Sequence, residues 1–188
     1  MGAEDKIDLD IFKVVNRAIA ESSSLVVMVN HLSQLLVGAL ELKGCAIYVL
    51  NPESKELEAL ASFGLSVKYM TKGPLLANKS IGAILKKKAV IIGDVNNSNR
   101  LQYPEEAKKE GIGAIISIPI MLHTEAIGAL RLYHHEAWDI SEQDIDSLMV
   151  LGENIGLAMT YTRVLNALSS VKDAINDVHS IWLSPDRK

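Results

Sequence analysis

The chain has 188 residues, with 19 Lys and Arg against 23 Asp and Glu, a net charge of −4 and 48% hydrophobic residues. This length and composition predict one domain with an ordinary hydrophobic core. We expect neither nucleic acid nor an anionic membrane as a partner, because those contacts need clustered Lys and Arg and the chain has no basic block.

The single cysteine, Cys45, allows neither an intrachain disulfide nor a cysteine-based zinc cage. Residues 1–10 lack the basic start and apolar run of a secretory signal. The longest apolar run, residues 111–122, is shorter than the roughly 20 residues of a membrane-spanning helix and contains Pro119. We therefore expect a soluble, cytoplasmic protein.

The first third of the chain predicts two helices and a hairpin. Apolar residues at helical spacing indicate a helix from Ile7 to about Ser22 and a second one from Leu25 to Leu40, with Gly44 where a helix stop usually falls. The runs 45–50 and 55–63 then flank the turn-forming residues 51–54. They predict a β-hairpin.

The middle of the chain is less regular. Residues 64–77 have no clean period, residues 80–88 predict a short helix and residues 90–95 a third strand. Residues 103–110 predict another short helix, with Pro104 in its first turn. The β-like runs 114–121 and 126–134 form a second hairpin, which should lie in the centre of a sheet.

A long helical pattern follows Ser141, a suitable N-cap. From Leu148 its apolar residues advance by three or four positions, as in a heptad repeat, with one irregularity between Leu165 and Val171. A helix from Ser141 to Trp182 would be about 60 Å long, too long to cover its whole stripe on one small sheet. Either the helix projects or packs on a partner, or it bends at Ser169-Ser170 and folds back.

Together these elements predict an α+β fold with one sheet and helices mostly on one face. Three blocks, in this order, resemble the GAF domain family of signalling and small-molecule-sensing modules. The first block is Gly44–Leu50 with the turn Asn51-Pro52, and the second is Val90–Val95 with Arg100-Leu101. The third is Ser117–Ile120, then Ala126–Leu132, then Trp138–Asp144 leading into the last helix.

The resemblance implies a central antiparallel sheet with helices on one side and a ligand pocket on the other, beneath the irregular middle segment. The residues that we place near such a pocket are Phe63, Tyr69, Met70, Ile81, Ile92, Asp94, Arg100, Tyr103 and Ser117. The alternative is that the aromatic and aliphatic members are ordinary core. Asp94 and Arg100 could orient a polar ligand, or bond loop amides and each other.

The sequence lacks residues that several ligand-binding subgroups of this family use, and this reduces the number of ligands that the resemblance implies. Asn78-Lys79 matches the start of a cyclic-nucleotide signature, but no suitable Phe or Asp-Glu follows, so we expect no tight binding of cAMP or cGMP. Cys45 lies on the first predicted strand rather than in the middle segment, where bilin-binding relatives attach their pigment. Relatives that reduce free methionine sulfoxide use cysteine pairs, and one Cys cannot close that cycle.

No spacing of His, Ser, Cys or carboxylates indicates catalysis, and the five scattered histidines form no metal motif. We expect no bilin, haem or metal cofactor. At this length the chain has no room for a separate output domain, so the output acts in trans or the chain is a piece of a longer protein.

We therefore expect an N-terminal helix over residues 1–24, a GAF-like domain over 25–168 and a helical extension over 169–188. The expected function is that of a non-catalytic sensor that dimerises through its terminal helices. It would respond to a small molecule or a partner protein. A methionine sulfoxide reductase and a ligand-free dimerisation domain are the alternatives.

Overall fold

The structure is a computed structural model that describes residue 7 and residues 9–22, 24–76 and 87–183, with side chains described as far as residue 176. The helices are α1 (Leu9–Glu21), α2 (Leu25–Ala39), α3 (Val67–Met70), α5 (Pro104–Lys109) and α6 (Glu142–Leu183). The strands are β1 (Gly44–Leu50), β2 (Glu56–Phe63), β3 (Leu75–Leu76), β4 (Val90–Ile92), β5 (Ala114–Leu122) and β6 (Glu125–His134). The helix predicted over residues 80–88 falls mainly outside the described residues.

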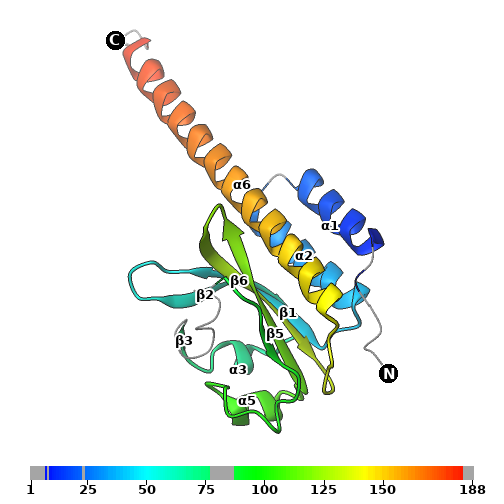
Figure 1. Cartoon of the computed structure of the whole chain (residues 1–188). Helices are drawn as coiled ribbons and strands as arrows, with labels where there is room; N and C mark the ends of the chain where they lie inside the picture. Colours follow the sequence, from blue (N-terminus) through cyan, green and yellow to red (C-terminus); the bar gives the residue numbers. More distant parts are fainter. Residues whose placement is uncertain (1–6, 8, 23, 77–86, 184–188) are drawn as a thin grey trace.

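The six strands form one antiparallel sheet in the order β3-β2-β1-β6-β5-β4, so both hairpins and the central place of the second are confirmed. Helices α2 and α6 cover one face of this sheet and α1 lies outside α2 (Figure 1). The short elements α3, β3 and α5 lie away from these long helices (Figure 1). This is the predicted α+β architecture.

Alternation along the strands divides the interior into two cores. The helix-side core packs one set of strand residues against α2 and α6, and its strand members are aliphatic apart from Cys45: Cys45, Ile47, Ala61, Ala114, Ile116, Ile118, Ile120, Leu130 and Leu132. The loop-side core lies on the other face and consists of Ala46, Tyr48, Leu57, Tyr69, Leu75, Val90, Ile92, Val95, Ala107, Ile112, Ile115, Ala129 and Tyr133. The middle segment thus packs on this face of the sheet and completes the second core of the domain.

Helix α1 is fastened to its own domain. Ile7, Ile11 and Val15 are buried in the helix-side core, and the Ile7 amide donates a hydrogen bond of 2.9 Å to Oδ1 of the buried Asp144 at the start of α6. Ile7 and Ile11, two members of the stripe Ile7, Ile11, Val14 and Ala18 that the predicted dimer would use, are therefore already covered within the chain. Val14, 42% exposed, is an exception.

Helix α6 begins after Ser141, whose hydroxyl accepts a hydrogen bond from the Asp144 amide at 3.0 Å. It continues through Ser169-Ser170 as one helix, so the bent, folded-back alternative is wrong. The first half lies on β5, and the second half projects from the domain (Figure 1). Within the described part of the chain, no helix is long and apolar enough to cross a membrane.

The predicted irregularity in the α6 stripe is also corrected. One row of α6 residues is buried against the domain and ends at Thr162: Leu148, Leu151, Ile155, Ala158 and Thr162. Every residue from 163 to 176 is exposed. The stripe predicted from the sequence follows this buried row to Thr162 and then continues with residues of a second row that is exposed, such as Leu168 and Val171. The change from one row to the other produced the apparent irregularity.

Two glycines let α6 approach the sheet closely. A Cβ at Gly152 would overlap the carbonyl oxygen of Pro119, and one at Gly156 would overlap the carbonyl oxygen of Met121, both on β5. The close packing that these glycines permit therefore occurs against the sheet. Because backbone meets backbone at two successive turns, α6 and β5 are held as one unit.

Candidate functional site

A buried arginine lies at the centre of the loop-side face. Arg131 on β6 is 2% exposed and pairs across the sheet with Ala46 of β1 and Ser117 of β5. Its Nε donates a hydrogen bond of 2.9 Å to the Ser117 hydroxyl. Its neighbours in sequence, Leu130 and Leu132, are buried in the helix-side core, as alternation along a strand requires.

Three tyrosines surround this arginine. The hydroxyls of Tyr48 and Tyr133 lie 3.3 Å apart, and the Tyr69 ring meets the Tyr133 ring edge-on at 5.8 Å. The Arg131 guanidinium carbon lies 5.9 Å from the centre of the Tyr133 ring. Burial raises the pKa of Tyr48 and of Tyr69, so both hydroxyls stay protonated and can donate hydrogen bonds.

A second cation adjoins the tyrosines. Lys72 places its Nζ 3.7 Å from the centre of the Tyr69 ring and donates a hydrogen bond of 2.9 Å to the Tyr69 carbonyl oxygen. Burial, and then the positive charge of Arg131, lower the pKa of Lys72 to about 8. We call Arg131, Ser117, Tyr48, Tyr69, Tyr133 and Lys72 the Arg131 cluster.

The short helix that carries Tyr69 is fixed by polar contacts. Ser66 caps α3 by accepting the Tyr69 amide at 3.1 Å. The Ser66 amide and hydroxyl also donate to the Glu110 carboxylate at 2.7 Å and 2.5 Å, which ties α3 to the end of α5. Burial opposes ionisation of Glu110, but the bonds from Ser66 and the charge of Lys43 hold its pKa below the usual range.

Five of the predicted pocket residues lie on this face. Tyr69 and Ile92 are buried in the loop-side core, and Met70 and Tyr103 pack against it. Ser117 holds Arg131. Of these five residues, Tyr69 and Ser117 belong to the Arg131 cluster, and the other three lie in or against the same core.

The other predicted pocket residues lie elsewhere. Phe63 is 44% exposed at the end of β2. Asp94 accepts hydrogen bonds from the Asn96 amide at 2.8 Å and from Nδ2 of Asn97 at 2.6 Å, so it shapes its own loop. Arg100 is exposed and, among the residues with described side chains, Asp94 and Arg100 form no ion pair with each other. Ile81 lies outside the described residues.

Sequence reasoning missed four members of the cluster: Arg131, Tyr48, Tyr133 and Lys72. A signal for the first was available, because Arg131 interrupts an otherwise apolar run in a strand predicted to be central. A charged residue is rarely buried on a central strand without a specific role or a set of partners.

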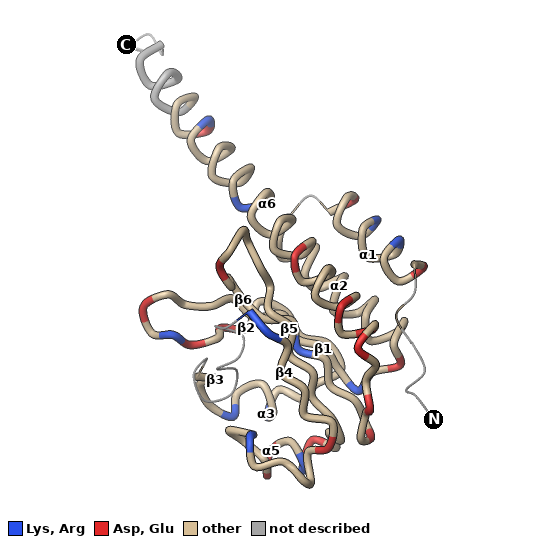
Figure 2. The backbone as a smooth tube through the Cα atoms, in the orientation of Figure 1, with Lys and Arg blue, Asp and Glu red and all other residues tan. Residues whose placement is uncertain are grey.

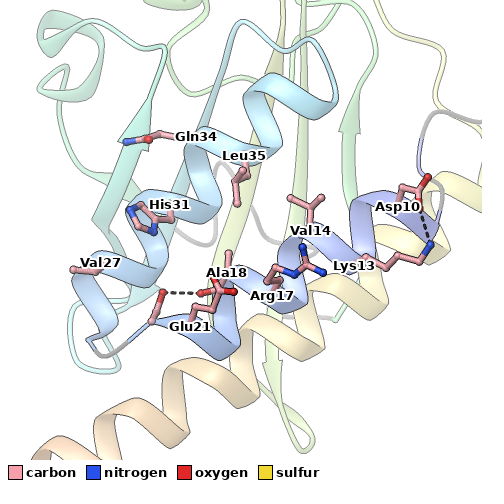
Figure 3. A pocket seen from close by; sticks show the side chains of 11 residues that line it. Asp10, Lys13, Val14, Arg17, Ala18, Glu21, Val27, His31, Gln34 and Leu35 are labelled. Atoms are coloured by element: carbon pink, nitrogen blue, oxygen red, sulfur yellow. Dashed lines mark hydrogen bonds and ion pairs between the residues drawn. The ribbon is translucent and has the colours of Figure 1, made fainter.

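Two surface hollows are formed by described residues, and neither is lined by a predicted pocket residue. One, of about 890 Å³, lies between α1 and α2 and is lined by apolar residues such as Val14 and Leu35 and by charged residues such as Arg17 and Glu21 (Figure 3). The other, of about 830 Å³, lies between the turns of both hairpins and α6, with Lys55, Glu125 and Arg163 among its lining residues. Both are open to solvent.

Comparison with known proteins identifies the fold family. Residues 22–160 match the family model described as GAF domain. Among curated protein sequences, none matches this chain.

Several solved structures share the fold at low sequence identity. The GAF domain from a phosphoenolpyruvate-protein phosphotransferase of Coxiella burnetii is 16% identical, with a TM-score of 0.73 over 85% of this chain and 98% of that one. A free methionine-R-sulfoxide reductase from Neisseria meningitidis, in complex with its substrate, is 14% identical, with a TM-score of 0.69 over 87% and 98%.

A domain of a putative two-component sensor histidine kinase from Sinorhizobium meliloti is 15% identical, with a TM-score of 0.60 over 87% of this chain and 98% of that one. The matched residues cover the sheet, α2 and the first half of α6. On this evidence the chain belongs to the GAF domain family.

Proposed function

We propose that this GAF domain is a sensor module in signal transduction that binds a small molecule at the Arg131 cluster and relays its presence to α6. The observation that carries the proposal is the placing of Arg131 and Lys72 among three tyrosines on the face of the sheet opposite the long helices. Membership of the GAF family and the similarity to a sensor kinase domain support a signalling role.

The chemistry of the cluster favours a ligand with an anionic group. Arg131 is buried with its Nε bound to Ser117, and Lys72 adds a second positive charge near the same rings. A carboxylate or phosphate is the group that a guanidinium binds best, and burial strengthens that interaction. The tyrosine rings offer apolar surface, and their hydroxyls offer further donors.

Strand β5 provides the physical connection from this cluster to α6. Its residue Ser117 holds Arg131, while two and four positions further along, Pro119 and Met121 place their carbonyl oxygens against Gly152 and Gly156. A ligand that shifts Ser117 would therefore displace the strand on which α6 rests. Coupling through one rigid strand needs no further moving part.

We propose no catalytic role for Cys45. The thiol is buried in the helix-side core, on the face of the sheet away from the Arg131 cluster, and burial raises its pKa well above the usual range. The thiolate is the reactive form of cysteine, and this environment suppresses it. An assay of NADPH oxidation with thioredoxin and free methionine sulfoxide tests the reductase alternative, and turnover there would contradict the sensor proposal.

Native mass spectrometry of freshly purified protein tests the ligand proposal. We expect the wild type to retain a small anionic molecule that is released on denaturation, and Arg131→Met to lack it. Leu130→Val is the matched control, because it alters the neighbouring residue on the opposite face and should keep the ligand.

A titration completes the test if the ligand is lost during purification. We expect the melting temperature of the wild type, but not of Arg131→Met, to rise with succinate or inorganic phosphate. The proposal would be overturned if the wild type and Arg131→Met retained the same small molecules, or none, and also responded identically to both anions.

A further inference from the structure

The second surface hollow opens where α6 leaves the domain. Thr162 is the last residue of α6 that is buried against the domain, and Arg163 begins the exposed stretch. Residues of both hairpin turns, of the start of α2 and of α6 line this hollow of about 830 Å³, which we call the hairpin hollow. Because the covering helix projects away from the sheet here (Figure 1), one end of the helix-side core is left partly open.

The apolar lining of the hairpin hollow is continuous with the helix-side core. Leu25, Leu60 and Ile127 pack against that core without being fully buried. Met159 of α6, which also lines the hollow, is a buried member of the core. Partly exposed aliphatic side chains in a concave surface favour an apolar ligand, because burial of their remaining surface is favourable.

The charged lining of the hairpin hollow is mostly positive. Lys55, Lys87 and Arg163 are exposed and line it together with one acid, Glu125. Among the described side chains, none of these four forms an ion pair. Figure 2 shows positive charge both in the turn between β1 and β2 and on α6 beyond the sheet. An anion in the hollow would therefore meet cations that have no carboxylate partner of their own.

We propose that the hairpin hollow binds a free fatty acid, with the acyl chain on the apolar lining and the carboxylate among the three cations. The volume of about 830 Å³ lies within the roughly 300–1,000 Å³ of small-molecule pockets. A guanidinium such as that of Arg163 can bind a carboxylate through two parallel hydrogen bonds. The acyl chain supplies the apolar surface that the aliphatic residues lack.

A soluble fatty acid fits the hollow better than a membrane surface does. Anionic bilayers are bound by clusters of about four to eight Lys and Arg, and only three cations line the hollow. The turns beside it also carry the exposed acids Glu53 and Glu125, which an anionic bilayer would repel. A concave surface encloses one chain but meets a flat bilayer poorly.

This site is separate from the Arg131 cluster. Ile127 and Arg131 both lie on β6, four residues or about 13 Å apart. Ile127 packs against the helix-side core, whereas Arg131 lies on the other face of the sheet. The two proposals can therefore fail separately: Arg131→Met should abolish the anion response of the cluster and leave fatty acid binding unchanged.

Calorimetric titration of the full chain with monomeric dodecanoate tests the proposal. We expect one site of micromolar affinity. Decanoate should bind about 10-fold more weakly, since each buried methylene contributes about fourfold. Dodecyltrimethylammonium, which has the same chain and the opposite charge, should also bind at least about 10-fold more weakly, and acetate should give no heat.

A charge variant and a matched control test the cations. Lys55→Gln/Arg163→Gln should weaken dodecanoate binding about 10-fold and, because both side chains are exposed, should keep the circular dichroism spectrum of the folded domain. Lys109→Gln/Lys172→Gln removes the same charge from exposed positions outside the hollow and should bind as the wild type does.

Methyl NMR with isotope-labelled methionine locates the ligand, because Met159 lines the hairpin hollow and Met70 packs against the loop-side core. Dodecanoate should shift the Met159 signal, assigned with Met159→Leu, and leave that of Met70 in place. The proposal would be overturned by a shift of Met70 alone, by loss of binding in Arg131→Met, or by equal affinities of the charge variant and its control. It would equally be overturned if the wild type bound phosphatidylglycerol vesicles but not monomeric dodecanoate.

Discussion

The two faces of the β-sheet carry cores of different chemistry. On the helix side the strand residues are aliphatic apart from Cys45, and two glycines bring α6 into backbone contact with β5. On the loop side an arginine, a serine and two tyrosines take the strand positions, a third tyrosine packs on them from α3, and a lysine lies beside them. The residues of both sets are buried, so burial alone does not distinguish the two faces.

The difference shows which face is specialised for stability. Aliphatic packing is the cheapest way to stabilise a sheet, whereas a buried guanidinium costs solvation free energy that its partners only offset. A domain that needed only stability would carry aliphatic residues on both faces. We therefore expect substitutions on the helix side to lower the free energy of unfolding, and replacement of Arg131 together with its partner Ser117 on the loop side to affect binding more than stability.

Gly156→Val should have the largest effect, because its Cβ would overlap the Met121 carbonyl oxygen and lift α6 from β5. We expect a loss of at least about 3 kcal/mol in the free energy of unfolding, measured by urea denaturation. Gly38→Ala is the control: nothing lies within 4 Å of the added methyl group, so stability should be kept or slightly raised. A stable Gly156→Val protein would contradict the close packing of α6.

Ser117→Ala should have the next largest effect. It removes the acceptor for Nε of a buried, charged side chain, so we expect a loss of about 2 kcal/mol in the free energy of unfolding. Ser170→Ala, an exposed serine on α6, should cost much less. Equal melting temperatures for both variants would show that the bond between Ser117 and Arg131 contributes nothing.

Lys72→Met should change how the free energy of unfolding depends on pH, with a large effect at neutral pH and a small one at high pH. The pKa of Lys72 is about 8 in the folded protein and near 10.5 when unfolded, so the unfolded state binds more protons between these values. Stability therefore rises with pH from about 8 because of this residue, and the penalty is fully present below pH 8.

Thermal melts at pH 7, 8 and 9 test this prediction; Lys72→Met should gain most at pH 7 and least at pH 9. The pH range of the test ends at 9 because burial raises the pKa values of Cys45, Tyr48 and Tyr69. At higher pH these groups lose protons more readily in the unfolded protein, which lowers the stability of the folded one. A difference between variant and wild type that stays constant with pH would contradict the assignment.

Much of the fold could be predicted because local patterns agree with it. Alternation, turn residues and helical stripes gave both hairpins, α1, α2 and the capped start of α6 close to their observed bounds. The two cores were harder to separate, since residues on both faces of β5 are apolar and only strand pairing shows which face each one takes.

The site could be predicted only in part. Tyr69, Ile92 and Ser117 were found from the irregular segment and the family resemblance, but Arg131 looked like one residue of a motif. Its environment arises from strands β1, β5 and β6, which are distant in sequence. The apolar stripe of α6 was predicted, but its first half was assigned to residues that the domain buries, because sequence periodicity shows apolar stripes without showing which one the sheet covers.

The most direct test compares adjacent residues of β6 that point to opposite faces. By urea denaturation, Leu130→Ala should lose about 2 to 5 kcal/mol in the free energy of unfolding, because it leaves a cavity in the helix-side core. The double variant Ser117→Ala/Arg131→Met should lose less than about 1 kcal/mol, since it replaces the buried charge and its partner by apolar groups of similar size. A double variant that loses as much as Leu130→Ala would show that Arg131 serves stability, and would contradict the assignment of the loop side to binding.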